Sequence, residues 1–513
     1  MAFPEKRDSD SAHSPSDDEK KVGAMPDQYQ TLGHADLPPD PDAGLSQDEK
    51  ARIDRRLLWK LDLRLIPWLC LLYLISFLDR TNIGNARLVG LEDDLNITGG
   101  QYNAALSLFF VSYSLSEPLT NILLKRLRPS IFIPAIMLLW GICMTTMGLV
   151  HNFQGLMASR FFLGLAEAGL FPGINYYLSC WYKRNEFGIR AAIFFSAAAV
   201  SGSFGGLLAA AIAQMDGVGG KAGWCWIFIL EGIATVLVGV ASFWMVFDFP
   251  DEATFLSPVD RERVIRRLKE DQQSSAEHED FQISYFWASV KDWKTWLYAV
   301  IYMGADGPLY AFSLFLPTII GPNGLGFAGT RAQLLSVPPY AVAACLTVLI
   351  GWVADRTQQR GMCNAGVSIL GVIGFAMLLG SKVASVQYAG TFLGALGIYP
   401  CIANTITWAS NNTEGVYKRG VTLGIVIGWG NLNGVVSSNI YRRKDAPTYY
   451  VGHGVVFSYL VLFLLGGSTI MYFLLRRENA NRRAGKRDDL VAGKSDAEIE
   501  ALGDVRPNFI YTL

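Results

Sequence analysis

The chain has 513 residues and a net charge of −1, with 51% hydrophobic and only 17% charged residues. Soluble proteins average about 25% charged residues. The low share of charge and the long apolar runs exclude a secreted disulfide scaffold, a nucleic-acid binder and a mainly disordered chain. The seven cysteines are scattered and form no CxxC pair, so they indicate small apolar residues rather than metal ligands.

Residues 1–50 are polar and acidic, with many Ser and Pro residues and few large apolar ones. They contain no apolar stretch of the kind found in a signal peptide. A segment of this composition buries too little surface to fold on its own. We therefore expect a disordered acidic tail over 1–50.

Twelve apolar runs of roughly 20 residues follow, which is the length that an α-helix needs to cross the hydrocarbon core of a bilayer. They fall near 64–84, 102–124, 131–150, 155–179, 187–213, 224–248, 295–319, 332–354, 364–383, 387–410, 420–440 and 454–475. Six precede a charged stretch and six follow it. The pattern predicts an all-α membrane protein made of two pseudo-symmetric six-helix bundles. The first bundle covers 51–248, a central loop covers 249–293, the second bundle covers 294–477, and a tail covers 478–513.

Lys and Arg residues gather in the even-numbered connections and next to both ends of the apolar region. Cytoplasmic loops of membrane proteins carry such an excess of basic residues. The distribution places both tails and the central loop in the cytoplasm. Residues 442–444, in the connection after the eleventh run, are the one local exception.

Four charged residues lie deep in two of the apolar runs: Asp79 and Arg80 in the first, Arg160 and Glu167 in the fourth. A charge at the middle of a bilayer costs about 2.5–3.5 kcal/mol on insertion scales. Arg160 and Glu167 are seven residues apart and so share one face of a helix. Apolar replacement of a buried ion pair is often neutral or stabilising, so stability alone does not explain two charges of each sign in these runs. We therefore interpret these four residues as functional.

Other buried polar residues admit a structural reading as well. Glu231, beside Gly232, favours a purely structural role, whereas Glu117, before Pro118, fits structure and function equally. Asp306 stands in the seventh run.

In the second half, Asn404 and Trp408 share one helix face with Asn411, and Asn431 lies in a glycine-rich helix whose small residues favour close helix packing. Each asparagine fits an interhelical hydrogen bond as well as a substrate contact. Trp408 fits ordinary packing equally well.

Three motifs carry a family resemblance: residues 351–360 (GWVADRTQQR), 77–86 (FLDRTNIGNA) and 160–173 (RFFLGLAEAGLFPG). From about residue 52 to 477 the chain resembles the major facilitator superfamily, and within it the anion:cation symporter family, especially the fungal allantoate-permease-like group. The first motif matches the gating motif of that superfamily, with the positions Gly351, Asp355, Arg356 and Arg360. The equivalent first-half connection, 121–129 (NILLKRLRP), lacks the Gly and Asp, which leaves its gate contacts undefined.

The resemblance implies a substrate site between the two bundles and transport by alternating access. Members carry organic anions, typically carboxylates, together with protons or another cation. By that likeness Arg80 binds the substrate carboxylate, Asp79 and Glu167 are the protonatable acids, and Arg160 steadies Glu167. Asn404, Trp408 and Asn431 are our candidates for the second-half side of the site.

Burial and a nearby arginine act in opposite directions on a carboxyl group. We therefore hypothesise that Glu167 competes with the substrate for the charge of Arg80 and takes a proton when the anion binds.

The expected partners are a small organic anion, protons and the lipid bilayer, with no nucleic acid. We expect a monomer, by default in the plasma membrane, although the basic loops fit the vacuolar membrane as well. The sequence contains no HExxH or GxSxG motif, and we expect no enzymatic activity, metal or cofactor. A passive carrier or anion exchanger remains an alternative, and a non-transporting nutrient sensor is a third. A ureide, a vitamin acid and a di- or hydroxy-acid all remain compatible as substrates.

Overall fold

The computed structural model describes residues 40–270, 283–321, 324–327, 329–495, 498–499 and 502–513. Most of the predicted tail 1–50 and residues 271–282 of the predicted central loop lie outside the described residues. The described part is built of helices and contains no β-strand.

The helices of the first half precede a connecting segment that itself forms two shorter helices. The first half contains α1 (Gln47–Leu88), α2 (Leu91–Asp94), α3 (Gly99–Leu127), α4 (Pro129–Met147), α5 (Phe153–Glu167), α6 (Leu170–Ser179), α7 (Arg184–Ile212) and α8 (Gly223–Met245). The connecting segment contains α9 (Pro258–Glu270) and α10 (Ile283–Lys291).

The second half repeats a series of long helices, one of which contains a π-helical stretch, Tyr459–Gly466. The α-helices are α11 (Trp293–Ile320), α12 (Gly329–Thr357), α13 (Arg360–Gly380), α14 (Ala384–Asn411), α15 (Val416–Asn431), α16 (Asn433–Ile440), α17 (Tyr450–Ser458) and α18 (Gly467–Arg483). Short 3-10 helices occur at Ala213–Met215, Val218–Gly220, Arg443–Asp445, Asp488–Leu490 and Gly503–Val505.

Ten helices or helix pairs in the described residues are long and apolar enough to cross a membrane, judged by length and composition. Each of them coincides with one of the predicted runs. The other two predicted runs coincide with α3, which carries Glu117 and several serines, and with the α5–α6 pair, which is divided at Ala168 and Gly169. The all-α membrane fold is confirmed, and twelve crossings remains a prediction.

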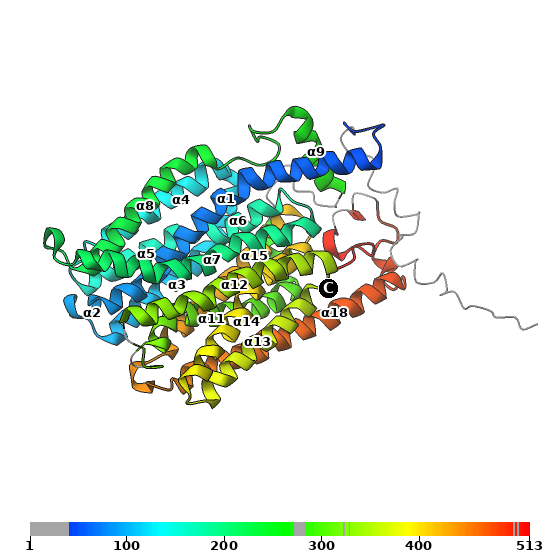
Figure 1. The fold of residues 1–513 in the computed structure, drawn as a ribbon. Helices are drawn as coiled ribbons and strands as arrows, with labels where there is room; N and C mark the ends of the chain where they lie inside the picture. The colour runs from blue at the N-terminus through cyan, green and yellow to red at the C-terminus, as the bar shows by residue number, and fades with distance from the viewer. Residues whose placement is uncertain (1–39, 271–282, 322–323, 328, 496–497, 500–501) are drawn as a thin grey trace, which may run out of the picture. The chain divides into compact units, whose positions relative to one another are not determined.

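The long helices run side by side (Figure 1). In the first half α4 packs on α8, α3 on α5 and α1 on α7; in the second half α13 packs on α14 and α11 on α15. The halves meet where α7 packs on α12 and where α3 packs on α15 and α16. Each contact between the halves therefore pairs a long helix of one half with a long helix of the other, as in transporters built from two repeated bundles.

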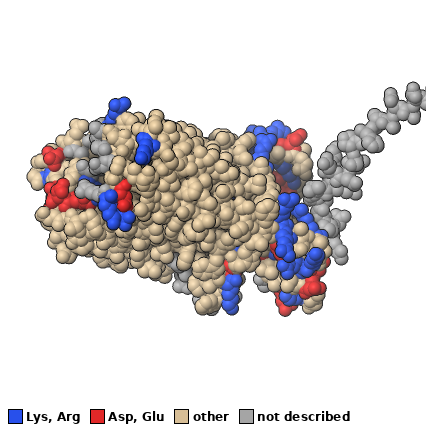
Figure 2. Space-filling view, turned by 90° about the horizontal axis from the view of Figure 1, so that it is seen from below, with Lys and Arg blue, Asp and Glu red and all other residues tan. Residues whose placement is uncertain are grey.

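Charged side chains lie toward the two ends of the bundle, and the visible face between them is largely uncharged (Figure 2). A bilayer core about 30 Å thick requires such an uncharged band around a multi-pass protein. The surface pattern and the helix lengths together indicate how the molecule sits in a membrane.

Helix α1 begins before the predicted first bundle, inside the predicted 1–50 tail. Ser46 and Glu49 form a capping box at its start. The charged first part of α1 pairs with α9: Lys60 lies 2.8 Å from Asp260, and Arg267 lies 2.7 Å from Asp54. We call the end of the bundle formed by residues 47–62, 258–270, 483–495 and 502–513 the terminal end.

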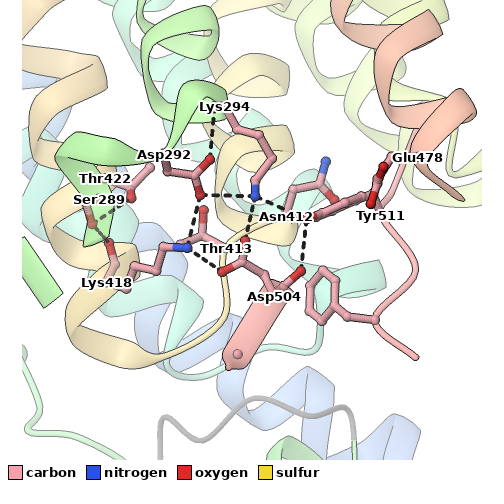
Figure 3. A network of polar contacts seen from close by, with 12 residues as sticks. Ser289, Asp292, Lys294, Asn412, Thr413, Lys418, Thr422, Glu478, Asp504 and Tyr511 are labelled. Atoms are coloured by element: carbon pink, nitrogen blue, oxygen red, sulfur yellow. Dashed lines mark hydrogen bonds and ion pairs between the residues drawn. The ribbon is translucent and has the colours of Figure 1, made fainter. Parts of the chain in front are cut away.

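The last residues of the chain are docked against the terminal end of the second half (Figure 3). Both carboxylate oxygens of Asp504 are paired, one with Lys294 of α11 and one with Lys418 of α15, each at 2.6 Å. The Tyr511 hydroxyl accepts a hydrogen bond from Arg482 at 2.7 Å. The tail thus ties the ends of α11, α15 and α18 to one another.

Lys294 and Lys418 stabilise the ionised form of the Asp504 carboxyl group. Burial alone would raise its pKa, but the Lys294 and Lys418 ammonium groups outweigh burial and keep the pKa below the usual 3.8. A carboxyl group with a lowered pKa contributes stability above its unfolded pKa and loses it only as the pH falls through the folded value. The contribution of Asp504 is therefore complete at any pH above about 4.

We predict that Asp504→Asn lowers the free energy of unfolding by about 2–3 kcal/mol, because two buried cations lose part of their counter-charge. Thermal unfolding of the full-length protein in detergent measures the effect, which should be the same at pH 5 and pH 7. Asp489→Asn, at an exposed position of the same tail, is the matched control and should unfold like the wild type. Equal unfolding temperatures for Asp504→Asn and wild type contradict this assignment.

Candidate functional site

Arg80 of α1 and Glu167 of α5 form an ion pair in the middle of the bundle. Arg80 Nη2 and Nε lie 2.6 and 3.2 Å from the same carboxylate oxygen, Glu167 Oε1. Ser76 Oγ donates a third hydrogen bond to that oxygen at 2.6 Å. Glu167 is fully buried, and its other oxygen, Oε2, has no partner among the described residues. The structure therefore brings together the predicted anion-binding residue and one predicted proton acceptor.

Aromatic rings surround the Arg80 guanidinium. Its central carbon lies 4.7 Å from the centre of the Tyr113 ring, 5.5 Å from Phe109 and 5.7 Å from Tyr310. Rings at these distances attract a cation through their quadrupoles. They also exclude water, so the guanidinium depends on the few acceptors it has.

A chain of hydrogen bonds leads from Arg80 into the second half and back. Arg80 Nη1 donates to the Tyr310 hydroxyl of α11 at 2.5 Å, which donates to Asn431 Oδ1 of α15 at 2.6 Å. Asn431 Nδ2 then donates to Glu117 Oε2 of α3 at 3.2 Å. Asn431 thus lies beside the Arg80 cluster, and it also makes the interhelical hydrogen bond expected of it.

Two helix ends place these polar groups. Helix α5 ends at Glu167 and α6 begins at Leu170, while α15 ends at Asn431 and α16 begins at Asn433. Interrupted membrane helices with polar groups at the break are typical of transporter binding sites. The local sequence therefore puts one polar residue of each half at a break.

Asp79 points away from Arg80, although the two are neighbours in the sequence. Its Oδ2 accepts hydrogen bonds from Trp140 Nε1 of α4 at 3.0 Å and from Thr235 Oγ1 of α8 at 2.8 Å. Consecutive residues of an α-helix are about 100° apart around the axis, so Asp79 faces the interior of the first half. Nearby, Glu231 accepts a hydrogen bond from Asn82, a contact that supports its structural interpretation.

Arg160 does not pair with Glu167 in this conformation. Arg160 is buried, and its Nε and Nη2 have no partner among the described residues. Seven residues separate the two along α5, which places them about 10 Å apart along the helix axis. Arg80 reaches Glu167 from the adjacent helix instead, so the expected pairing differs from the observed one.

The predicted gating residues lie at the terminal end, where α7 meets α12. Asp355 Oδ2 accepts a hydrogen bond from the Ile189 backbone N–H at 2.6 Å, and its Oδ1 pairs with Arg360. A Cβ on Gly351 would overlap α7 at Ala192, so only glycine permits this approach. Arg356 is exposed and lies over the Trp352 ring. Three of the four residues thus hold the halves together at this end.

Asn404 and Trp408 lie with the gate rather than with Arg80. Asn404 Nδ2 donates to the Arg360 carbonyl at 2.9 Å, and Arg360 Nη1 donates to Asn404 Oδ1 at 3.2 Å. Trp408 Nε1 donates to the Thr512 carbonyl at 2.9 Å. In the described conformation neither residue touches the Arg80 cluster, because both lie on the last turns of α14, toward the terminal end.

A small cavity of about 30 Å³ lies between the halves, against the turns of α1 on either side of Arg80. It is lined by residues of α1, α7, α11 and α12, including Thr81, Asn85, Ser313 and Tyr340. A cavity of this size holds about one or two water molecules. Toward the terminal end, the gate contacts of Asp355 with Ile189 and Arg360 are closed.

A family model described as Major Facilitator Superfamily matches residues 69–438. The chain belongs to the Major Facilitator Superfamily.

Among its relatives, the chain is 35% identical to an MFS-type transporter, cnsO, of Penicillium expansum, over 90% of each chain. It is 34% identical to the high-affinity nicotinic acid transporter of Saccharomyces cerevisiae, over 90% of this chain and 85% of that protein. It therefore shares nearly its whole length with known transporters.

Solved structures of the superfamily share the fold. A bacterial homologue of the human lysosomal transporter Spinster, inward-facing and occupied, has a TM-score of 0.56 at 15% identity, covering 84% of this chain and 98% of that one. The proton:xylose symporter XylE has a TM-score of 0.55 at 12% identity, covering 79% and 99%. The protein is a superfamily transporter of a small molecule and not an enzyme.

Sequence reasoning did not single out Tyr113 and Tyr310, which complete the surroundings of Arg80. A signal was present: Tyr113 precedes the buried Glu117 by four residues, and Tyr310 follows the buried Asp306 by four. Residues four apart share a helix face, so a tyrosine one turn from each buried acid points toward the same polar centre.

We predict that Asp355→Ala speeds amide hydrogen exchange in residues 184–192 by about tenfold or more, because the Ile189 contact and the counter-charge of Arg360 are lost together. Exchange followed by mass spectrometry on the full-length protein measures this opening. Arg356→Ala, at the exposed neighbour, is the control and should leave exchange in α7 unchanged. Unchanged exchange in Asp355→Ala contradicts the gate contact.

Proposed function

We propose that this transporter takes up a small carboxylate together with protons, by alternating access around the Arg80–Glu167 pair. The observation that carries the proposal is that two guanidinium nitrogens of Arg80 are bound to a single oxygen of Glu167. A guanidinium presents a planar fork of donors that fits a carboxylate. A substrate carboxylate is therefore a direct competitor of Glu167 for Arg80.

Charge balance supports the proton. The middle of the described bundle buries five acids, Asp79, Glu117, Glu167, Glu231 and Asp306, but only two guanidiniums, those of Arg80 and Arg160. An unpaired buried charge is expensive, and a buried acid avoids that penalty by binding a proton. An anion that displaces Glu167 from Arg80 leaves one more acid without a counter-charge, and a proton on Glu167 restores the balance.

Substrate and proton then help each other to bind. An anion on Arg80 makes Glu167 a better proton acceptor, and a proton on Glu167 frees Arg80 for the anion. Such coupling is reciprocal by thermodynamic necessity. Asp79 is the second proton acceptor of the proposal; its Oδ1 has no partner among the described residues. Arg160, with two unpartnered nitrogens, remains the proposed charge partner of these acids.

Movement of the substrate requires the gate to open. Asn404 and Trp408 join Asp355 and Arg360 at the terminal end, so we assign them to the gate instead of the anion site. Asn431 remains the second-half side of the site through Tyr310. Basic residues in the even-numbered connections and near both ends of the apolar region favour a cytoplasmic terminal end. Uptake across the plasma membrane rests on the family resemblance.

The relatives also favour a carboxylate as the substrate. A relative that matches over most of this chain is named a nicotinic acid transporter, and nicotinic acid is a carboxylate. The resemblance to the allantoate-permease-like group also stays part of the proposal. A passive carrier or exchanger is the competing function, and it would show exchange without acid-driven accumulation.

We predict that Glu167→Gln abolishes acid-driven accumulation of a labelled carboxylate in proteoliposomes while counterflow exchange persists. The amide keeps the shape of Glu167 but takes up no proton, and each unit of pH gradient otherwise supplies about 1.4 kcal/mol per proton. The probe is labelled nicotinate, with unlabelled carboxylates as competitors.

Glu231→Gln is the matched control, since Glu231 is a buried membrane acid that accepts its hydrogen bond from Asn82 and does not touch Arg80. It should accumulate the probe like the wild type. Full accumulation by Glu167→Gln removes Glu167 from proton coupling. Exchange without accumulation in the wild type itself favours the exchanger.

A further inference from the structure

The last part of the eleventh predicted run forms a helix of its own. Helix α15 ends at Asn431, beside the Arg80 cluster, and α16 begins at Asn433, after the break at Leu432. Because α15 starts at the terminal end, α16 leads from the central cluster toward the opposite end of the bundle. We call this opposite end, formed by α2 and residues 441–449, the far end. The break thus leaves an eight-residue helix between the central cluster and the far end.

Helix α16 meets α3 of the first half through two contacts. Gly434 faces the ring of Phe110, and a Cβ at that position would overlap the ring, so only glycine permits this approach. Nearer the far end, Asn439 Nδ2 donates a hydrogen bond to Ser107 Oγ at 3.1 Å. Phe110 is 2% exposed, whereas Asn439 is exposed. The halves are therefore joined by a buried apolar contact and, outside it, by a polar contact at the rim.

The same short helix is bound to its own half by hydrogen bonds. Ser437 Oγ donates to the Gly307 carbonyl of α11 at 2.7 Å, and the Tyr459 hydroxyl donates to Asn433 Oδ1 at 2.9 Å. Both bonds stay within the second half. When the halves separate at the far end, α16 therefore remains with the second half, and its contacts with α3 are the ones that must break.

Phe110 also touches the central cluster. The centres of the Phe110 and Tyr310 rings lie 4.6 Å apart, in an edge-on arrangement that is favourable for aromatic pairs. The Tyr310 hydroxyl accepts a hydrogen bond from Arg80 and donates one to Asn431. The Phe110 ring thus lies between Tyr310 and the bare surface of α16 at Gly434.

The other seam between the halves, where α7 meets α12, is closed beside the cavity. Ser203 Oγ donates to the Val337 carbonyl at 3.4 Å, and a Cβ on Gly202 would be 3.0 Å from the Tyr340 ring. Alternating access around a fixed site needs a barrier on each side of that site. The gate at Asp355 supplies the barrier at the terminal end, and the contacts of α16 lie where the second barrier is required.

We propose that Phe110 and Gly434 form the second gate of this transporter, which closes the substrate path at the far end while the gate at Asp355 opens at the terminal end. Asn439 and Ser107 complete this far gate at the rim. The far gate opens when α3 and α16 move apart and the Phe110 ring leaves Gly434. The inference rests on the proposed alternating access, and it is independent of which substrate or ion is carried.

A wedge in the contact tests the far gate. Gly434→Ala places a methyl group against the Phe110 ring and should hold the far gate open. Amide hydrogen exchange of the full-length protein in residues 103–110 should then rise about tenfold, because α3 and α16 no longer meet closely. Exchange in residues 184–192, at the terminal end, should become slower, since two alternating gates do not open together. A contact that only holds the fold together would leave residues 184–192 unchanged or faster.

Two further variants control for side effects of the added methyl group. Gly454→Ala is the matched control, because Gly454 lies in α17 of the same half and a Cβ there meets nothing within 4 Å. It should exchange like the wild type in both segments. Adding Phe110→Ala to Gly434→Ala removes the ring that the methyl group meets. The double variant should return exchange in residues 184–192 to the wild-type rate.

A cross-link tests the opposite state, and it decides the matter if Gly434→Ala fails to fold. Ser107→Cys combined with Asn439→Cys, joined by a short reducible thiol reagent in proteoliposomes, should lock the far gate closed. Mass spectrometry confirms the link. Counterflow of labelled nicotinate should be lost and should return on reduction. The wild type and each single variant, treated in the same way, control for the native cysteines.

The outcomes separate the far gate from the proposed carboxylate and proton. Full counterflow by the cross-linked protein, or exchange in residues 184–192 that is not slowed by Gly434→Ala, overturns the far gate and leaves a fixed packing contact. The exchange measurements need neither substrate nor proton gradient. A wild type that carries no nicotinate therefore counts against the proposed substrate, while the exchange of residues 103–110 and 184–192 still decides the far gate.

Discussion

The Arg80 guanidinium is enclosed by aromatic rings, so its N–H groups must always have hydrogen-bond acceptors close by. The arrangement of the polar groups in the middle of the bundle depends on this requirement. Arg80 is 4% exposed, and Glu167 and the Tyr310 hydroxyl accept hydrogen bonds from its guanidinium. The break that ends α5 at Glu167 and the Ser76 hydroxyl both serve to hold that carboxylate in place. Because a buried guanidinium without a partner is costly, the proposed binding of a carboxylate to Arg80 is an exchange of acceptors rather than a simple addition.

The same helices that carry the central groups also reach the gate and the docked tail. Helix α11 carries Tyr310 near its middle and Lys294 at its terminal end, and α15 carries Asn431 at one end and Lys418 near the other. Asp504 ties these two terminal ends together. A displacement of Tyr310 or Asn431 therefore acts on α11 or α15, two helices whose terminal ends are already joined to each other. This construction supports the proposed alternating access by rocking of one bundle against the other.

The sequence allowed the helices to be predicted, because apolar length and helical period fix depth and face, and the family resemblance assigned Arg80 and Glu167 to one substrate site. It did not allow the partners to be predicted. Whether Glu167 meets Arg80 of α1 or turns toward Arg160 of its own helix depends on how α1 is placed beside α5, and one sequence contains no such information. Asn404 and Trp408 share the expected face, yet the last turns of α14 lie toward the gate. The docked tail depends on a few residues, such as Asp504 and Tyr511, in an otherwise polar segment.

The surplus of acids also constrains the order of events. Were all five central carboxyls ionised, an approaching anion would meet more negative than positive charge, and Arg80 would already be occupied. In the proposed mechanism, protons therefore bind before the anion or with it. Protonation of Glu167 lowers the local negative charge and at the same moment releases the donors that a carboxylate needs. In this proposal one proton performs two tasks, because Glu167 is both the negative charge bound to Arg80 and the competing ligand. The ion pair between α1 and α5 would thus couple proton and substrate without any direct contact between them.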